Sequence, residues 1–318
     1  PEGVVVGVLP PGAGADRTAR DGVIAALVAY LTWGWLPAFL LLIVVVPAPE
    51  LLAHRVIWSV PFGALIIGLR AQWPEVRRAF TTPRTFGWLC VSALFIGINW
   101  LVYIYAVQVA QIFQASLGYY INPLLLVLVG VLFFGEKLAG LQLAAVIAAT
   151  IGVTVLTISG GELPWISLVL AVSFTIYGVL RKQVEVGGMP GLFVETVLLL
   201  PFALAWVAYI HIQGTNLWLE TETSVSLLLM LAGPLTVIPL LGFALAARRL
   251  RLSTIGFMQF IAPTMQFGIG VLSGEPLSQG RLGCMGLIWL AVILFCADGL
   301  IARRKRRRAT SPEAPRAG

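Results

Sequence analysis

The sequence predicts an all-α polytopic membrane protein with ten transmembrane helices, arranged as two inverted five-helix repeats. Three observations lead to this fold class: an apolar composition, ten apolar runs of membrane-spanning length, and an internal duplication. Of the 318 residues, 59% are hydrophobic and only 11% are charged, whereas soluble proteins carry about 25% charged residues. Because so few charges cannot cover the surface of a soluble protein, we expect lipid to surround most side chains.

A helix that crosses a membrane needs about 20 mostly apolar residues. Ten runs of this kind follow one another along the chain, at 22–46, 51–69, 86–108, 112–134, 138–158, 164–180, 190–212, 225–247, 253–273 and 281–302. Turn-forming sequences separate them, for example PAPE at 47–50 and SGGELP at 159–164. The amphipathic stretch 70–86 is too polar to span, and we expect it to lie at the membrane surface.

The distribution of basic residues predicts the orientation of these spans. If the N-terminus is cytoplasmic, all of the 21 Lys and Arg residues except Arg55 and Arg281 fall on the cytoplasmic side, as the positive-inside rule requires. The reverse orientation would invert this bias, so we expect both termini in the cytoplasm. The Gly/Pro-rich residues 1–20 are predicted to be a disordered leader, and residues 303–318 a basic disordered cytoplasmic tail.

Two segments of the chain resemble each other, namely GYYINPLLLVLVGVLFFGEKL at 118–138 and FMQFIAPTMQFGIGVLSGEPL at 257–277. Pro123 aligns with Pro263 at an offset of 140 residues, and the two Gly-Glu pairs align after one deletion. These matches indicate a duplicated unit, with chance similarity between apolar segments as the alternative. Since five helices is an odd number, the second copy must enter the membrane from the opposite side, as in many secondary transporters.

Several motifs taken together resemble the RarD family, in the EamA branch of the drug/metabolite transporter superfamily. They include ELLAHRVIWS at 50–59, INWLVYIYAV at 98–107, QASLGYYINPL at 114–124, FFGEKL at 133–138 and RLRLSTIGFMQFIAPT at 249–264. The resemblance implies a multi-pass transporter of the cell (inner) membrane with two EamA repeats, which we assign to residues 21–158 and 159–302. The family name comes from an association with chloramphenicol sensitivity and supplies no physiological substrate. Pro276 departs from the basic residue expected after the second Gly-Glu pair.

Four of the ionisable residues inside or at the edge of predicted spans are functional candidates, because such groups usually face a cavity or a partner. Glu50 and His54 are one helical turn apart in the second span, and Glu195 is the counterpart of Glu50 in the second repeat. We predict that Glu50, His54 and Glu195 act in coupling or gating; alternatively, His54 bonds locally and Glu195 pairs with Arg181 or Lys182. Arg55 is predicted to attract an anionic group of the substrate at the outer vestibule, or else to extend to the outer interface.

Uncharged polar and aromatic residues are expected near the middle of the membrane, around Pro123 and Pro263. A proline frees a backbone carbonyl one turn back, and in a membrane that carbonyl needs a neighbour or a water-lined cavity. With Arg55, the predicted substrate-binding residues are Asn99, Trp100, Tyr103, Tyr119, Asn122 and Gln259. The alternative is that the amides hold helices together and the rings only pack.

The Gly135-Glu136 and Gly274-Glu275 pairs are predicted to be structural turns between helices. In each turn we expect the glutamate to begin the following helix and to stabilise its positive end.

The function predicted from these features is secondary-active transport of a small metabolite or drug-like solute by alternating access, coupled to a proton or to exchange. No ATP-binding GxxxxGK[ST] motif is present. An enzyme is not expected, because the two histidines, His54 and His211, belong to no catalytic motif, and a non-transporting membrane partner or sensor protein is the alternative. The expected partners are a small-molecule substrate and the lipid bilayer, with no nucleic acid, no cofactor and no metal; a homodimer is left open.

Overall fold

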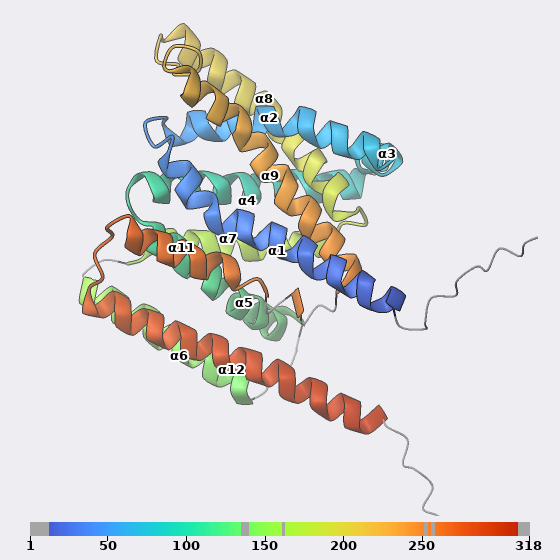
Figure 1. The fold of residues 1–318 in the computed structure, drawn as a ribbon, viewed down its shortest axis with the longest axis vertical. Helices are drawn as coiled ribbons and strands as arrows, with labels where there is room; N and C mark the ends of the chain where they lie inside the picture. The colour runs from blue at the N-terminus through green and yellow to red at the C-terminus, as the bar shows by residue number, and fades with distance from the viewer. Residues whose placement is uncertain (1–12, 135–139, 161–162, 251–253, 256–257, 311–318) are drawn as a thin grey trace, which may run out of the picture. The chain divides into compact units, whose positions relative to one another are not determined.

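A computed structural model describes residues 13–134, 140–160, 163–250, 254–255 and 258–310 (Figure 1). Within these ranges the regular secondary structure is helical throughout. The helices are α1 (Ala13–Leu41), α2 (Ala48–Leu69), α3 (Trp73–Thr81), α4 (Pro83–Gln108), α5 (Ile112–Phe134), α6 (Gly140–Gly160), α7 (Trp165–Lys182), α8 (Gly188–Ile212), α9 (Thr223–Arg249), α11 (Ile261–Leu272) and α12 (Gln279–Thr310).

Eight helices in the described part of the chain are long and apolar enough to cross a membrane. They are α1, α2, α4, α6, α7, α8, α9 and α12. Helix α5 is not among the eight, although it has 23 residues, and some of its side chains are not described. Helix α11 has only 12 residues. The protein is therefore a polytopic all-α membrane protein.

The described residues divide into two compact units, the first drawn from 1–36, 53–86 and 185–265. Small residues allow its helices to approach closely. A Cβ atom on Gly233 of α9 would overlap the backbone carbonyl carbon of Trp58 on α2. Similarly, a Cβ atom on Gly242 of α9 would lie 2.7 Å from the carbonyl oxygen of Ala25 on α1. Contacts this short require glycine, and they place the α9 backbone directly against α1 and α2.

The second unit is drawn from residues 37–52, 87–184 and 266–318. Within it α6 packs along α12, and α5 packs along α7 (Figure 1). Glycines again mark the contacts, because a Cβ atom on Gly118 of α5 would lie 2.8 Å from the carbonyl oxygen of Ser167 on α7. On α6, a Cβ atom on Gly152 would lie 3.2 Å from the carbonyl oxygen of Cys284 on α12.

The observed helices differ from the predicted spans in two places. The first helix ends at Leu41 instead of 46, because residues 42–45 form turns with hydrogen bonds such as that from the Leu42 N–H to the Phe39 carbonyl. The ninth predicted span, 253–273, contains the short α11 instead of one long helix. Pro263 near its start has no N–H to donate, which weakens the helix at that end. The polar stretch 70–86 forms the short helix α3 and the first turn of α4.

Helices also extend into both predicted disordered ends. Helix α1 begins at Ala13, and α12 continues to Thr310. Residues 303–310 contain no Gly or Pro and are mostly Arg, Lys and Ala, which favour helix, and this explains the extension. The rest of the predicted leader and tail, and the Gly135-Glu136 turn, lie outside the described residues.

The compact units do not coincide with the predicted repeats. Each unit contains segments from both 21–158 and 159–302. A sequence repeat and a compact unit are different divisions of a chain, so the repeat boundaries stay a prediction.

Candidate functional site

The best-defined polar cluster joins α4, α5 and α7 in the second unit. Asn99 on α4 is 1% exposed, and its Nδ2 donates to the carbonyl oxygen of Leu170 and to Oγ of Ser173, both at 3.0 Å. The hydroxyl of Tyr119 on α5 donates to Oδ1 of Asn99 at 2.9 Å. Asn99 therefore uses both donors and its acceptor within apolar helices, so its amide orientation is closely defined.

Aromatic rings extend this cluster. The Tyr119 ring lies between Tyr103 and Phe174, with each pair of ring centroids 5.8 Å apart. Phe174 in turn contacts Tyr177 at 5.7 Å. Edge-to-face and tilted contacts of this kind stabilise aromatic clusters by about 1 kcal/mol per pair beyond their buried area. The cluster thus combines fixed hydrogen-bonding groups with ring faces.

A second hydrogen bond joins the same helices one turn further along α5. Oδ1 of Asn122 accepts a hydrogen bond from the Thr175 hydroxyl at 2.8 Å. Both residues are buried, as is Trp100 on α4. Five of the predicted substrate-binding residues therefore lie in this unit, on α4 and α5. Their partners on α7, Ser173 and Thr175, were not predicted, although a polar SFT sequence inside an apolar span was a visible signal.

Arg55 on α2 lies in the first unit and is buried, with 5% of its surface exposed. Its Nε donates to Oγ1 of Thr236 on α9 at 2.6 Å, and the Thr236 hydroxyl donates to the carbonyl of Ala232 in its own helix. The guanidinium therefore packs against α9, and both predicted roles of Arg55 stay predictions. Thr236 was missed from the sequence because a lone threonine in an apolar helix commonly bonds its own backbone.

His54 lies beside Arg55 in the chain and is 2% exposed. Its ring centroid is 5.4 Å from that of Trp218, which also contacts Trp58 at 6.1 Å. Trp218 belongs to the loop after α8, where Nδ2 of Asn216 donates to its carbonyl oxygen at 2.9 Å. Neither ring nitrogen of His54 has a hydrogen-bond partner among the described residues. A buried imidazole without such partners is costly, and a water or a polar ligand group beside it would stabilise it.

The remaining predicted residues are two buried acids and one glutamine. Glu50, in the first turn of α2, is 2% exposed, and Glu195 on α8 has no exposed surface. Gln259 is half-buried just before α11, and its backbone N–H donates to the Ile255 carbonyl. The predicted residues fall into two groups: Arg55, His54, Glu195 and Gln259 in the first unit, and Glu50, Asn99, Trp100, Tyr103, Tyr119 and Asn122 in the second.

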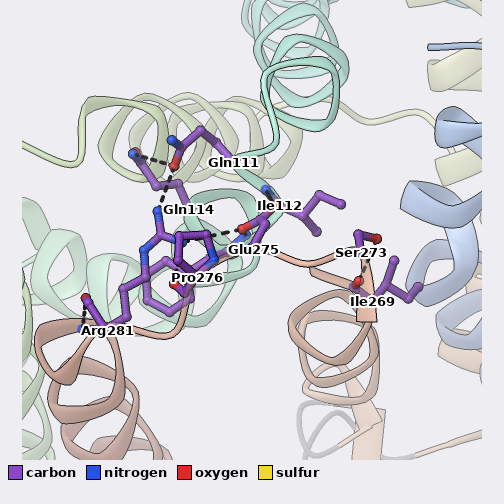
Figure 2. Close-up of polar contacts among 10 residues, drawn as sticks. Gln111, Ile112, Gln114, Ile269, Ser273, Glu275, Pro276 and Arg281 are labelled. Atoms are coloured by element: carbon purple, nitrogen blue, oxygen red, sulfur yellow. Dashed lines mark hydrogen bonds and ion pairs between the residues drawn. The ribbon is translucent and has the colours of Figure 1, made fainter. Parts of the chain in front are cut away.

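A third polar cluster lies at one end of the second unit, at the start of α5 (Figure 2). The carboxylate of Glu275, which is 6% exposed, accepts hydrogen bonds from the backbone N–H groups of Ile112 and of Phe113, the latter at 2.9 Å. Arg281 lies beside it, with a terminal nitrogen 3.9 Å from the carboxylate. The Arg281 guanidinium is centred 5.2 Å from the Phe113 ring and donates to Oε1 of Gln111 at 3.4 Å.

This arrangement corrects the prediction that Glu275 begins the helix that follows it. Helix α12 begins only at Gln279, and the carboxylate binds the N-terminus of α5 instead. The positive φ of 86° at Gly274 turns the chain before Glu275, a conformation that glycine adopts without strain. Helix N-termini attract carboxylates. The predicted stabilisation of a helix N-terminus by this glutamate is therefore present, but the helix is the distant α5 and not the one that follows in the chain.

Burial raises the pKa of the Glu275 carboxyl above its ordinary value. The N–H groups of Phe113 and Ile112 and the charge of Arg281 act in the opposite direction. The loss of hydration on burial outweighs these contacts, because desolvation disfavours the charged form.

The described residues contain no group of three or more His, Cys, Asp or Glu side chains that could hold a metal ion.

Comparisons with known proteins agree with this architecture. Residues 20–158 match the EamA-like transporter family. A Salmonella typhi relative named Protein RarD is 43% identical over 291 residues, which cover 91% of this chain and 99% of the relative. A Vibrio cholerae relative named Uncharacterized transporter is 41% identical over 295 residues, covering 92% of this chain and 98% of its own.

The fold is also shared with a solved protein. A crystal structure 20% identical in sequence aligns with a TM-score of 0.57 over 87% of this chain and 97% of that chain. This likeness concerns the fold alone. The sequence relatives go further, because they match nearly from end to end and their family is one of transporters and not of enzymes. The chain accordingly belongs to the RarD family, in the EamA branch of the drug/metabolite transporter superfamily, and is a multi-pass membrane transporter.

Proposed function

We propose that this protein is a secondary-active transporter that moves a small metabolite or drug-like solute across the inner membrane by alternating access. The observation that carries the proposal is the Asn99–Tyr119–Ser173 cluster, in which three apolar helices bury polar groups and aromatic rings together. Buried polar groups in membrane helices are costly and usually serve a solute path. Two inverted repeats, 21–158 and 159–302, supply the ten helices and the two exchangeable conformations.

The cluster favours a solute with a flat apolar part and a polar edge. The rings of Tyr103, Tyr119 and Phe174 offer faces for stacking, and Asn122 and Trp100 lie nearby on the same helices. Asn99 is saturated by its neighbours, so its proposed role is to orient the Tyr119 ring, while the rings contact the solute.

The buried ionisable residues are proposed to couple transport to a proton or to set charge selectivity. Arg55 would attract an anionic group of the solute from its position against Thr236 on α9. His54, whose ring nitrogens have no hydrogen-bond partner among the described residues, is proposed as the site of proton uptake in this coupling. Glu50 and Glu195 are proposed to act in the same coupling step, and both chain ends are proposed to be cytoplasmic.

Counterflow in proteoliposomes tests the proposed function. Proteoliposomes that contain the purified protein would each be loaded with one solute from a panel of amino acids, aromatic metabolites and chloramphenicol. Exchange of the enclosed solute for the same solute in labelled form would then be measured. We expect at least one aromatic solute to exchange. Folded protein that exchanges none of them would contradict the proposal and favour the alternative of a non-transporting partner or sensor.

Once a solute is found, the His54→Phe variant distinguishes a role of His54 in proton coupling from a role in packing against Trp218. Phenylalanine keeps the ring contact with Trp218 and removes both unsatisfied nitrogens, so we expect the folded protein to be at least as stable as the wild type. If His54 carries the proton, the variant should also lose the pH dependence of uptake. Glu195→Gln is the parallel variant on α8. Unchanged pH dependence in both would remove these residues from coupling.

A further inference from the structure

A small cavity adjoins the polar cluster at the start of α5 in the second unit. Its volume is about 130 Å³, and its polar lining comes from Gln111, Gln114, Ser278 and Arg281. Phe113 and Leu163 are among its apolar walls. A cavity of this size exceeds the space of a single water, about 30 Å³, and can hold a ligand group of several heavy atoms.

The hydrogen-bonding groups around this cavity are only partly used. Oε1 of Gln114 is buried and has no hydrogen-bond partner within the described ranges, while its Nε2 donates to Gln111 at 3.2 Å. Arg281 uses its terminal nitrogens for the Pro276 carbonyl and for Gln111. A buried acceptor therefore lies beside a guanidinium, and a ligand that satisfies both needs an anionic oxygen and an N–H or O–H donor.

The surroundings of the cavity have the character of a membrane interface. Trp165 directly follows Pro164, which lines the cavity, and Trp165 is 46% exposed. Its ring contacts Tyr105, itself 41% exposed, at 6.0 Å. Exposed Trp and Tyr side chains at helix ends are typical of the headgroup level of a bilayer. Leu163, which is 57% exposed, adds an apolar rim beside the polar base.

We propose that this cavity binds the headgroup of a phosphatidylethanolamine lipid. Arg281 would donate to the phosphate oxygens, and the half-buried Gln114 side chain would rotate so that its Oε1 accepts from the ammonium. The carboxylate of Glu275, 3.9 Å from Arg281, offsets part of the positive charge. A headgroup that carries its own cationic donor fits this balance better than a bare anion. The proposal concerns lipid recognition and does not depend on solute transport.

The test compares two lipids that differ in one property. Palmitoyl-oleoyl phosphatidylethanolamine (POPE) and palmitoyl-oleoyl phosphatidylcholine (POPC) have the same net charge and the same acyl chains. Only the ethanolamine headgroup has N–H donors. Native mass spectrometry of the full chain in detergent should show POPE binding about fivefold or more tighter than POPC, since one buried hydrogen bond contributes about 1 kcal/mol. Equal binding of the two lipids would overturn the proposal.

Variants assign this preference to the cavity. Gln114→Leu should abolish the preference for POPE over POPC, and Arg281→Gln should weaken the binding of both lipids. The matched control is Arg84→Gln, which removes an exposed arginine near the start of α4 and should change neither. If Arg281→Gln does not fold, Gln114→Leu alone decides. A full POPE preference in Gln114→Leu, or stabilisation by inorganic phosphate equal to that by POPE, would refute binding of a lipid headgroup here.

Discussion

The carboxylate of Glu275 accepts a hydrogen bond from the backbone N–H of Phe113 at 2.9 Å, although the two residues are 162 positions apart. The contact joins the turn between α11 and α12 to the first turn of α5 (Figure 2). The first N–H groups of a helix have no partner within the helix. A distant carboxylate therefore satisfies two of these groups in α5, the N–H groups of Ile112 and Phe113.

Glu275→Ala should lower the melting temperature of the purified protein. The change leaves two buried N–H groups, those of Ile112 and Phe113, without their acceptor. Each such group costs about 1–3 kcal/mol. Thermal unfolding in detergent measures the effect, with Glu220→Ala at an exposed position as the control. Equal melting temperatures for the two variants would show that the cap contributes nothing.

The protonation of Glu275 should appear in the pH dependence of stability. Because burial raises its folded-state pKa above the ordinary value of 4.5, the folded state holds the proton more tightly. The stability from this group is complete below the unfolded pKa and is lost as pH rises through the folded pKa. Wild type should therefore lose melting temperature relative to Glu275→Gln as the pH rises from about 4.5 through the raised pKa. Parallel curves for the two proteins would contradict the shift.

Gly233→Ala should strongly destabilise the first unit. The added methyl group would overlap the carbonyl carbon of Trp58, and a backbone cannot move aside as a flexible side chain can. Overpacking of this kind costs about 1–3 kcal/mol or more. Gly286→Ala on α12 is the matched control, since nothing lies within 4 Å of its Cβ position. The control should be stabilised by up to about 1 kcal/mol.

Both glycine variants can be compared by thermal unfolding and by the yield of monodisperse protein. If Gly233→Ala matches Gly286→Ala in both measurements, the close approach of α9 to α2 is not required.

Tyr119→Phe should clearly lower the rate of solute exchange, whereas the free energy of unfolding should change only slightly. The variant keeps the ring contacts with Tyr103 and Phe174 but loses the hydrogen bond to Asn99, worth about 1 kcal/mol. The loosened ring should raise the KM of the solute severalfold. Tyr105→Phe, on the exposed surface of α4, is the control and should behave as wild type. Counterflow rates at varied solute concentration give the comparison, and an unchanged KM for Tyr119→Phe would argue that the cluster is only structural.

The apolar spans could be predicted because their signal is local. A run such as 86–108 is long and apolar enough to form a membrane helix whatever it packs against, and α4 occupies 83–108. The polar residues of α4 and α5 were also visible, since Asn99 and Asn122 stand out in apolar surroundings. The short length of α11 was harder to predict. Pro263 indicates a disturbed helix, but proline can either kink a membrane helix or end it.

Partners across helices could not be predicted in the same way. The sequence does not show which residues Thr236, Ser173 and Trp218 contact. Their roles follow only from the contacts with Arg55, Asn99 and His54, respectively. In helices that are apolar all round, periodicity does not show which face meets another helix.

The sequence by itself determined that this chain is a polytopic helical membrane transporter of the RarD family, because composition and motif content are properties of the chain alone. Only the tertiary structure decided that Glu275 binds the N-terminus of α5 and that Arg55 bonds Thr236. The physical reason is that a helix in lipid satisfies its own backbone, whereas polar side chains and helix ends are satisfied by whichever distant groups packing brings within hydrogen-bonding distance.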